Sequence, residues 1–307
     1  MATQAEIRDE ITSRIVTALQ SGNLPPWRRP WGGINTGTPQ NAVSKKNYRG
    51  INVLLLGLNE SYQSRFWATF RQWRDLGGSV RKGEHGTRVV FWKPIEKETL
   101  NDDGEAETEA FFLLREYCVF NVEQTEGTAL DKFRVQSGIN GGNNFKDCER
   151  AENIMAATNA DIRFGGNRAF YQPHDDYIQM PMKVSFENEP AYYSTLAHEA
   201  CHWSGHDSRL NRLKTNARFG DSSYAFEELV AEIGGCFLCN EMGIPQSTDM
   251  TNHQAYLAHW LAVLQQDHGA ILRAAGQASK AVDFVKAFSQ PAVTDAESEE
   301  TAAVVAA

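Results

Sequence analysis

The segment His198-Glu199-Ala200-Cys201-His202 decides how this 307-residue chain is interpreted. Residues four apart lie on one face of an α-helix, so the two histidines can bind one ion. Glu199 follows the first histidine and can reach the open position at that ion, where it would take a proton from water. This spacing explains how a His-Glu-x-x-His motif binds a metal and activates water. A helix that merely contains two histidines is the alternative.

The flanking sequence favours the metal site. The stretch before the motif and Trp203-Ser204-Gly205 after it fit a packed helix that ends at a glycine. A strand over residues 176–182 precedes the helix, and we expect an edge strand there that binds a peptide by strand addition. Because a third ligand is also available nearby, we interpret the motif as a metal-dependent hydrolase site.

Three residues are candidates for the third ligand. Residues 226–232, Phe-Glu-Glu-Leu-Val-Ala-Glu, resemble the thermolysin-type pattern, in which a glutamate ligand precedes an acidic residue by four. The resemblance implies that Glu228 binds the metal and that Glu232 supports a ligating histidine from behind. Glu227 is the alternative by one position. His206 is the alternative by residue type, provided that the helix continues past the glycine.

The net charge of −9 is distributed unevenly along the chain. Residues 1–93 contain fourteen lysines and arginines against six aspartates and glutamates, whereas the remainder contains sixteen against thirty-three. This asymmetry indicates two domains with different partners, the first of which meets something anionic.

Aromatic and basic residues are interleaved in the first of these parts, which holds five of the seven tryptophans. Bases of a single strand stack on aromatic rings while cations follow the phosphates, so this mixture favours single-stranded DNA. The alternatives are that the rings belong to the core and that the charge serves solubility. The candidate contacts are Trp27, Arg28, Arg29, Trp31, Lys45, Lys46, Tyr48, Arg49, Arg81 and Lys82.

Composition excludes several classes of protein. The chain has no run of about 18 apolar residues, which a membrane-spanning helix requires, and we expect no membrane partner. Its first residues lack a secretion signal. Five cysteines without framework spacing suit a reducing cytoplasm, where we place the protein. Cys236 and Cys239 lie in an apolar helical stretch, and we expect them to pack in the core.

Local patterns predict an α+β protein of two domains. We expect an N-terminal mixed α/β domain over residues 1–125, a linker over 126–145, a C-terminal domain over 146–290 and a disordered tail over 291–307. The predicted elements of the first domain are a helix from Thr3 to about Gly22, a helix over 66–76, a hairpin over 80–92, a solvated loop over 94–110 and a strand over 111–122. Those of the second are helices near 146–159, 191–205, 222–242 and 251–288, with a strand near 176–186.

Six segments together resemble a known family. They are Pro26-Trp27, Pro30-Trp31, and residues 48–52, 77–84, 198–205 and 224–232. In this order they are similar to the segments of the ArdC antirestriction proteins, which join an N-terminal single-stranded-DNA-binding domain to a C-terminal zincin-like metallopeptidase domain. The resemblance covers residues 5–288, nearly the whole chain.

The resemblance implies a protein of conjugative plasmids that protects entering single-stranded DNA from host restriction. It also implies one Zn²⁺ per chain, with another divalent metal such as Mn²⁺ as an alternative, and a host restriction-system protein as target or substrate. Other readings stay open: a non-proteolytic DNA coat with a structural metal, a protease of DNA–protein crosslinks like the SprT and Spartan proteins, and an N-terminal protein-interaction module.

Overall fold

The computed structural model describes residues 3–21, 25–27, 37–59, 62–100, 106–135, 148–213, 222–245 and 254–289. Its helices are α1 (Gln4–Gln20), α2 (Ile51–Gly57), α3 (Phe70–Asp75), α4 (Glu149–Ala157), α5 (Glu189–Ser204), α6 (Ser222–Met242), α7 (Gln254–Gln266) and α8 (Ala270–Ala287). Its strands are β1 (Gln40–Asn41), β2 (Phe66–Ala68), β3 (Ser79–Val80), β4 (Thr87–Leu100), β5 (Ala106–Asn121), β6 (Thr125–Glu126), β7 (Asp161–Phe164), β8 (Phe170–Gln172) and β9 (Tyr177–Met180). Short 3₁₀ helices are η1 (Val122–Gln124), η2 (Thr128–Phe133) and η3 (Lys183–Ser185).

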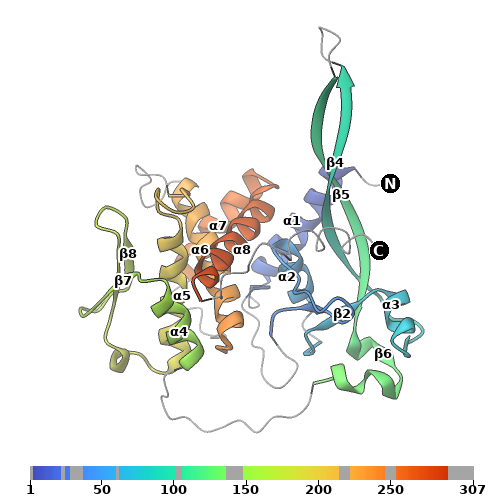
Figure 1. Cartoon of the computed structure of the whole chain (residues 1–307), viewed down its shortest axis with the longest axis horizontal. Helices are drawn as coiled ribbons and strands as arrows, with labels where there is room; N and C mark the ends of the chain where they lie inside the picture. The colour runs from blue at the N-terminus through green and yellow to red at the C-terminus, as the bar shows by residue number, and fades with distance from the viewer. Residues whose placement is uncertain are drawn as a thin grey trace.

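The structure combines helices with largely antiparallel sheets, as the predicted α+β class requires (Figure 1). Helices α5 to α8 form a bundle at one side, and the four-stranded sheet lies at the other, with β4 and β5 projecting from it as a long arm. The N-terminal helix begins as predicted, because the side chains and backbones of Thr3 and Glu6 form a reciprocal capping box. No helix in the described ranges is long and apolar enough to cross a membrane.

The arm corrects the prediction for residues 80–110. The sheet order is β1-β2-β5-β4, and β4 pairs antiparallel with β5 from Thr87–Val119 to Leu100–Ala106. The expected hairpin over 80–92 is wrong because β3 pairs with β6 instead. The expected solvated loop over 94–110 is also wrong at both ends, because its first residues belong to β4 and its last residues belong to β5. Cross-strand backbone hydrogen bonds hold a two-stranded ribbon together, so its sequence need not alternate between apolar and polar residues.

Two other boundaries of the first part differ from their predictions. The helix expected over 66–76 is a strand followed by α3, because Thr69 caps that helix through a capping box with Gln72. The linker expected over 126–145 begins inside a folded segment. There β6 pairs with β3, and Leu130 and Phe133 are buried beside Trp73. Residues 136–147 and the predicted tail over 291–307 lie outside the described residues.

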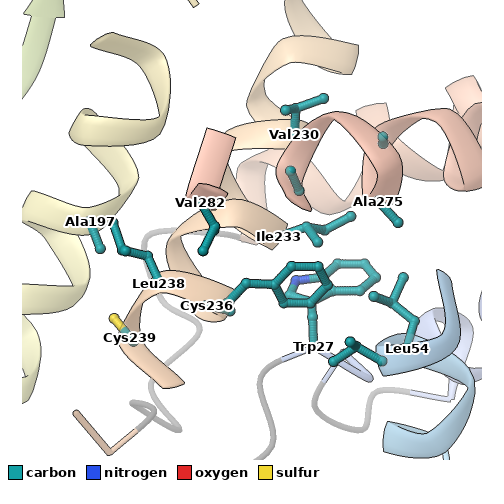
Figure 2. Close-up of a cluster of buried hydrophobic side chains, with 14 of the residues drawn as sticks. Trp27, Leu54, Ala197, Val230, Ile233, Cys236, Leu238, Cys239, Ala275 and Val282 are labelled. Atoms are coloured by element: carbon teal, nitrogen blue, oxygen red, sulfur yellow. The ribbon is translucent and has the colours of Figure 1, made fainter. Parts of the chain in front are cut away.

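The two parts of the chain share one hydrophobic core. Figure 2 shows Trp27 and Leu54 from the N-terminal part packed with Ile233 of α6 and Ala275 of α8. The Trp27 ring also meets that of Trp260 edge-on, with centroids 6.1 Å apart. Cys236 and Cys239 are buried and free in this core, which confirms the prediction made for them. The DNA-binding and metal-binding regions predicted from sequence are therefore faces of one packed body.

The C-terminal sheet corrects the predicted edge strand. Its order is β7-β9-β8, with β9 parallel to β7 and antiparallel to β8. The strand expected near 176–186 is β9, which ends at Met180 and lies in the middle of the sheet. In the described part of the chain, β7 and β8 are the two edge strands of this sheet, and β8 pairs with β9 alone. The helix expected over 251–288 is two helices, because the chain turns at Asp267, whose carboxylate accepts the backbone N–H of Gly269.

Candidate metal centre

A close crossing of α5 and α6 builds the site. The Asn188 side chain caps α5 by accepting the N–H of Ala191. On α6, Gly234 and Gly235 face the helix that carries the motif. A Cβ at Gly235 would lie 3.1 Å from the backbone nitrogen of His198, and one at Gly234 would lie 2.7 Å from the Sγ of Cys201. The glycine pair therefore permits a separation at which side chains from both helices can share one ion.

Three donor atoms converge at this crossing. The Nε2 atoms of His198 and His202 are 3.2 Å apart, and each is 3.6 Å from a carboxylate oxygen of Glu228. A tetrahedral metal with bonds of about 2.0–2.2 Å holds its ligands roughly 3.3–3.6 Å apart. The Nε2–Nε2 distance is close to that spacing, and the two 3.6 Å distances reach different oxygens of Glu228, Oε2 from His198 and Oε1 from His202, so the residues present fit a divalent metal ion.

The charge of the site fits a cation as well. Glu199, Glu228 and Glu232 are buried around the two histidines. Burying several carboxylates together is costly unless positive charge compensates them. Burial by itself raises the pKa of Glu228, but its hydrogen bond to His198 and the nearby histidines outweigh burial and lower the pKa to about 2. Ionised Glu228 is thus ready to bind a metal.

In the protein without metal, protons supply part of this compensation. Burial lowers the pKa of His198, but the hydrogen bond to Glu228 and the charges of Glu199, Glu228 and Glu232 reverse the effect and raise the pKa to about 9. A metal that binds here must therefore displace a proton from His198 at neutral pH.

A buried ion pair orients the second histidine. The Nδ1–H of His202 donates to Glu227 at 3.1 Å, which leaves Nε2 with a lone pair for the metal. Glu227 is held in turn by Arg212, whose Nε and Nη2 donate to its two oxygens at 2.8 and 2.9 Å. Arg212 also donates to the carbonyl of Cys201 on α5, and its side chain is only 6% exposed.

Glu232, expected to support a ligating histidine, faces His198, whereas Glu227 contacts His202. Glu232 Oε2 lies 3.9 Å from His198 Nδ1, which is beyond hydrogen-bond distance. The spacing of the sequence pointed to Glu232, four positions after Glu228. The carboxylate that forms a hydrogen bond with a histidine is Glu227, the residue just before Glu228. Arg212 was missed altogether, because no motif surrounds an arginine that reaches the site through the fold.

The predicted alternatives for the third ligand point elsewhere. Glu227 is engaged by Arg212 and by the far side of His202. The helix ends at Ser204, and His206 Nδ1 is bonded to the hydroxyl of Ser208 at 2.7 Å. Among the described residues, the cluster able to hold a metal comprises His198, His202 and Glu228.

The centre opens into a cleft of about 1110 Å³. Glu199, 7% exposed, lies at its wall beside the two histidines. Tyr224 also lines the cleft, and its side-chain hydrogen bond helps to lower the pKa of Glu228. Strand β8 forms part of the opposite wall through Phe170 and Tyr171.

Strand β8 is anchored to the end of the motif helix. The Tyr171 hydroxyl donates to Asp176 at 2.7 Å, and Arg209 donates to the same carboxylate at 2.9 Å. The Arg209 guanidinium stacks over the ring of Trp203 on α5 at 4.1 Å. The open edge of β8 thus keeps a defined position relative to the metal ligands.

Known protein families match the two parts of the chain separately. The N-terminal domain of the anti-restriction factor ArdC matches residues 5–120, and a zincin-like metallopeptidase model matches residues 149–277. The metal-free crystal structure of the ArdC antirestriction protein from plasmid R388 is 39% identical, with a TM-score of 0.75, and the match covers 92% of this chain and 98% of that one. The chain belongs to the ArdC family of antirestriction proteins.

Three further matches extend this comparison. The Mn(II)-bound structure of R388 ArdC is 37% identical, with a TM-score of 0.74, over 93% of this chain and 99% of that one. The uncharacterized protein y4eC of Sinorhizobium fredii is 35% identical over 93% of both chains. The Escherichia coli DNA primase TraC is 36% identical over 94% of this chain, which spans only 28% of the primase.

The structure sorts the residues predicted to bind DNA in this ArdC-family chain. Trp27 and Tyr48 are buried, at 2% and 7% exposed, so neither ring is open to stacking on a base. Exposed residues on the same list are Lys45, Lys46, Arg49, Arg81 and Lys82. Arg28, Arg29 and Trp31 lie outside the described residues.

Arg81 stabilises the turn in which it lies. Its guanidinium donates to Glu84 at 2.6 Å and to the backbone carbonyl of Glu123 at 2.7 Å. These bonds tie the turn after β3 to η1, which follows β5, so a phosphate would have to compete with them. Lys45, Lys46, Arg49 and Lys82 remain as the described cations of the predicted set.

Proposed function

We propose that this protein is a plasmid-type antirestriction protein that binds single-stranded DNA and cleaves peptide bonds at a divalent metal centre. The metal is Zn²⁺ or Mn²⁺, held by His198, His202 and Glu228. The protein acts in the cytoplasm of the recipient cell on a host protein of the restriction system. Family membership supports the antirestriction role, and the geometry of the cleft supports the peptidase.

One observation carries the proposal: three residues that can hold a metal converge, and the centre opens into a large cleft. Structural zinc sites are closed by four protein ligands, whereas catalytic sites keep a position for water or substrate. A divalent metal bound here would supply a Lewis acid that polarises a carbonyl and acidifies water. This observation favours the peptidase over a non-proteolytic protein with a structural metal.

Residues of the chain then divide the remaining work. Glu199, buried at the cleft wall next to the first ligand, accepts a proton from water and later gives it to the leaving amine. The edge of β8 takes the peptide as an added strand, because its outer backbone groups face away from β9. Tyr224 lies where it can donate to the oxygen that becomes negative in the transition state.

Replacement of Glu199 by glutamine tests the peptidase. Plasmid transfer would be counted into a restricting and a non-restricting recipient, with the metal content of the purified variant measured in parallel. We expect Glu199→Gln to retain the metal and to lose protection only in the restricting recipient. Full protection by a metal-loaded Glu199→Gln protein would refute the peptidase and favour the non-proteolytic alternative.

A further inference from the structure

A second hollow lies between the N-terminal part and the helices of the C-terminal part. Its volume is about 430 Å³, and it is separate from the metal cleft. Residues just after β1 form one wall, and the ends of α6 and α8 form the other. Charged residues from both sides line it: Lys45, Lys46, Arg49, Glu241, Asp283 and Lys286.

Positive charge exceeds negative charge in this hollow. Lys286 pairs with Glu241 at 2.5 Å, and Arg49 pairs with Asp283. In the part of the chain that the structure describes, Lys45 and Lys46 have no ion pair, because the two carboxylates of the hollow are engaged by other cations. Two uncompensated lysines therefore remain at its rim.

Lys45 stands in particularly crowded positive surroundings. Its Nζ lies 4.4 Å from the centroid of the Phe133 ring, and the Nζ of Lys132 lies 5.1 Å from the same centroid. Partial burial and the charge of Lys132 both lower the pKa of Lys45. Arg65 is close as well, with its Nε buried and without a hydrogen-bond partner among the described atoms. An anion beside Lys45 would relieve this repulsion.

Cationic side chains cover the aromatic rings near Lys45, so these rings are not open to stacking with bases. Lys45 and Lys132 cover Phe133, which is 4% exposed, and Arg65 lies over Phe66 at 6.0 Å. Tyr48 is buried in the wall of the hollow. A nucleic acid that enters the hollow thus meets lysine and arginine groups suited to phosphate, and the aromatic rings serve to hold those groups in place.

We propose that this hollow binds the phosphodiester backbone of single-stranded DNA, which crosses there from the N-terminal part onto α6 and α8 and leaves its bases outside. This inference rests on the proposed DNA-binding function and specifies where and through which chemistry it acts. Lys45 and Lys46 bind phosphate oxygens directly. Lys286 joins them when a phosphate replaces Glu241 as its partner, so both parts of the chain contribute to the site.

The test measures binding of a fluorescein-labelled 20-nucleotide oligothymidylate and of an abasic strand of equal length to the full-length protein. We expect Lys45→Gln/Lys46→Gln to weaken binding about tenfold or more at moderate salt. Its slope of log K against log salt should be shallower by about 1.4, because each lost contact to a single strand removes roughly 0.7. The abasic strand should bind the wild-type protein within threefold of oligothymidylate.

Two single substitutions provide matched comparisons. Lys280→Gln removes an exposed lysine of α8 that does not line the hollow, and it should change affinity less than twofold. Glu241→Gln removes the carboxylate that competes with phosphate for Lys286, and it should raise affinity several-fold. A gain of affinity is a result that mere loss of structure would not produce. Circular dichroism melts would verify that each variant folds.

The possible outcomes distinguish failure of the proposed phosphate site from failure of the proposed DNA-binding function. Wild-type affinity in the Lys45→Gln/Lys46→Gln variant, or a loss in Lys280→Gln as large as in that variant, would place the strand elsewhere and overturn the inference. Tenfold weaker binding of the abasic strand would overturn its backbone-only chemistry. No binding of either strand by the wild-type protein would instead refute the DNA-binding function itself.

Discussion

Removal of the Glu227 carboxylate should weaken metal binding although Glu227 is not a ligand. Its Oε1 accepts the Nδ1–H of His202 at 3.1 Å and so selects the tautomer that offers Nε2 to the metal. Loss of such a support typically costs about 10- to 100-fold in metal affinity, or roughly 1.4–2.7 kcal/mol. We therefore expect Glu227→Ala to raise the Kd for Zn²⁺ by one to two orders of magnitude.

The same substitution leaves Arg212 buried without its partner. Removing one member of a buried ion pair costs about 3–5 kcal/mol of stability, so Glu227→Ala will also melt at a lower temperature. Glu227→Gln separates the two effects, because its amide oxygen still accepts from His202 and from one nitrogen of Arg212. Its metal affinity should lie between those of the wild-type and alanine proteins.

The assay is a competition titration of the metal-free protein against a chromophoric zinc chelator at 25 °C, below the melting range. Glu232→Gln is the matched control, since that carboxylate stands 3.9 Å from His198 Nδ1. We expect its effect on the Kd to be smaller than that of Glu227→Gln. A folded Glu227→Ala protein with unchanged Kd, or a larger loss in Glu232→Gln, would contradict the assignment of Glu227 as the supporting carboxylate.

Three further predictions follow from the packing and charge of the site. Because the pKa of His198 is raised to about 9, apparent Zn²⁺ affinity should rise about tenfold per pH unit between pH 7 and 9; a plateau above pH 7 would indicate an ordinary histidine. Gly235→Ala should lower the free energy of unfolding by about 1–3 kcal/mol and weaken metal binding, because the added methyl group forces α5 and α6 apart. Gly276→Ala on α8 places its methyl group in open space, so thermal melts should show no loss of stability. Trp27→Ala should cost about 3–5 kcal/mol and lower one shared unfolding transition in calorimetry; separate transitions would show that the two parts do not share a core.

Much of the fold was accessible from local patterns. The helix predicted from Thr3 to about Gly22 is α1, and the bounds of α6 agree with the helix predicted over 222–242. Hydrogen bonds within a helix join residues three or four apart, so a short window of sequence contains most of the information that a helix needs. The strands were harder, since β3 pairs with β6 far along the chain rather than with the strand that follows it.

Residues 198–202 by themselves determined that two histidines and a glutamate share one face of a helix, because α-helical periodicity alone settles that relation. Only the tertiary structure decided that Glu228 joins them, that Glu227 and Arg212 hold His202 in place, and that β8 rather than β9 offers the open edge. It also decided that Trp27 belongs to the core. These relations depend on how closely α5 and α6 cross and on which strands pair, and the packing of the whole chain sets both.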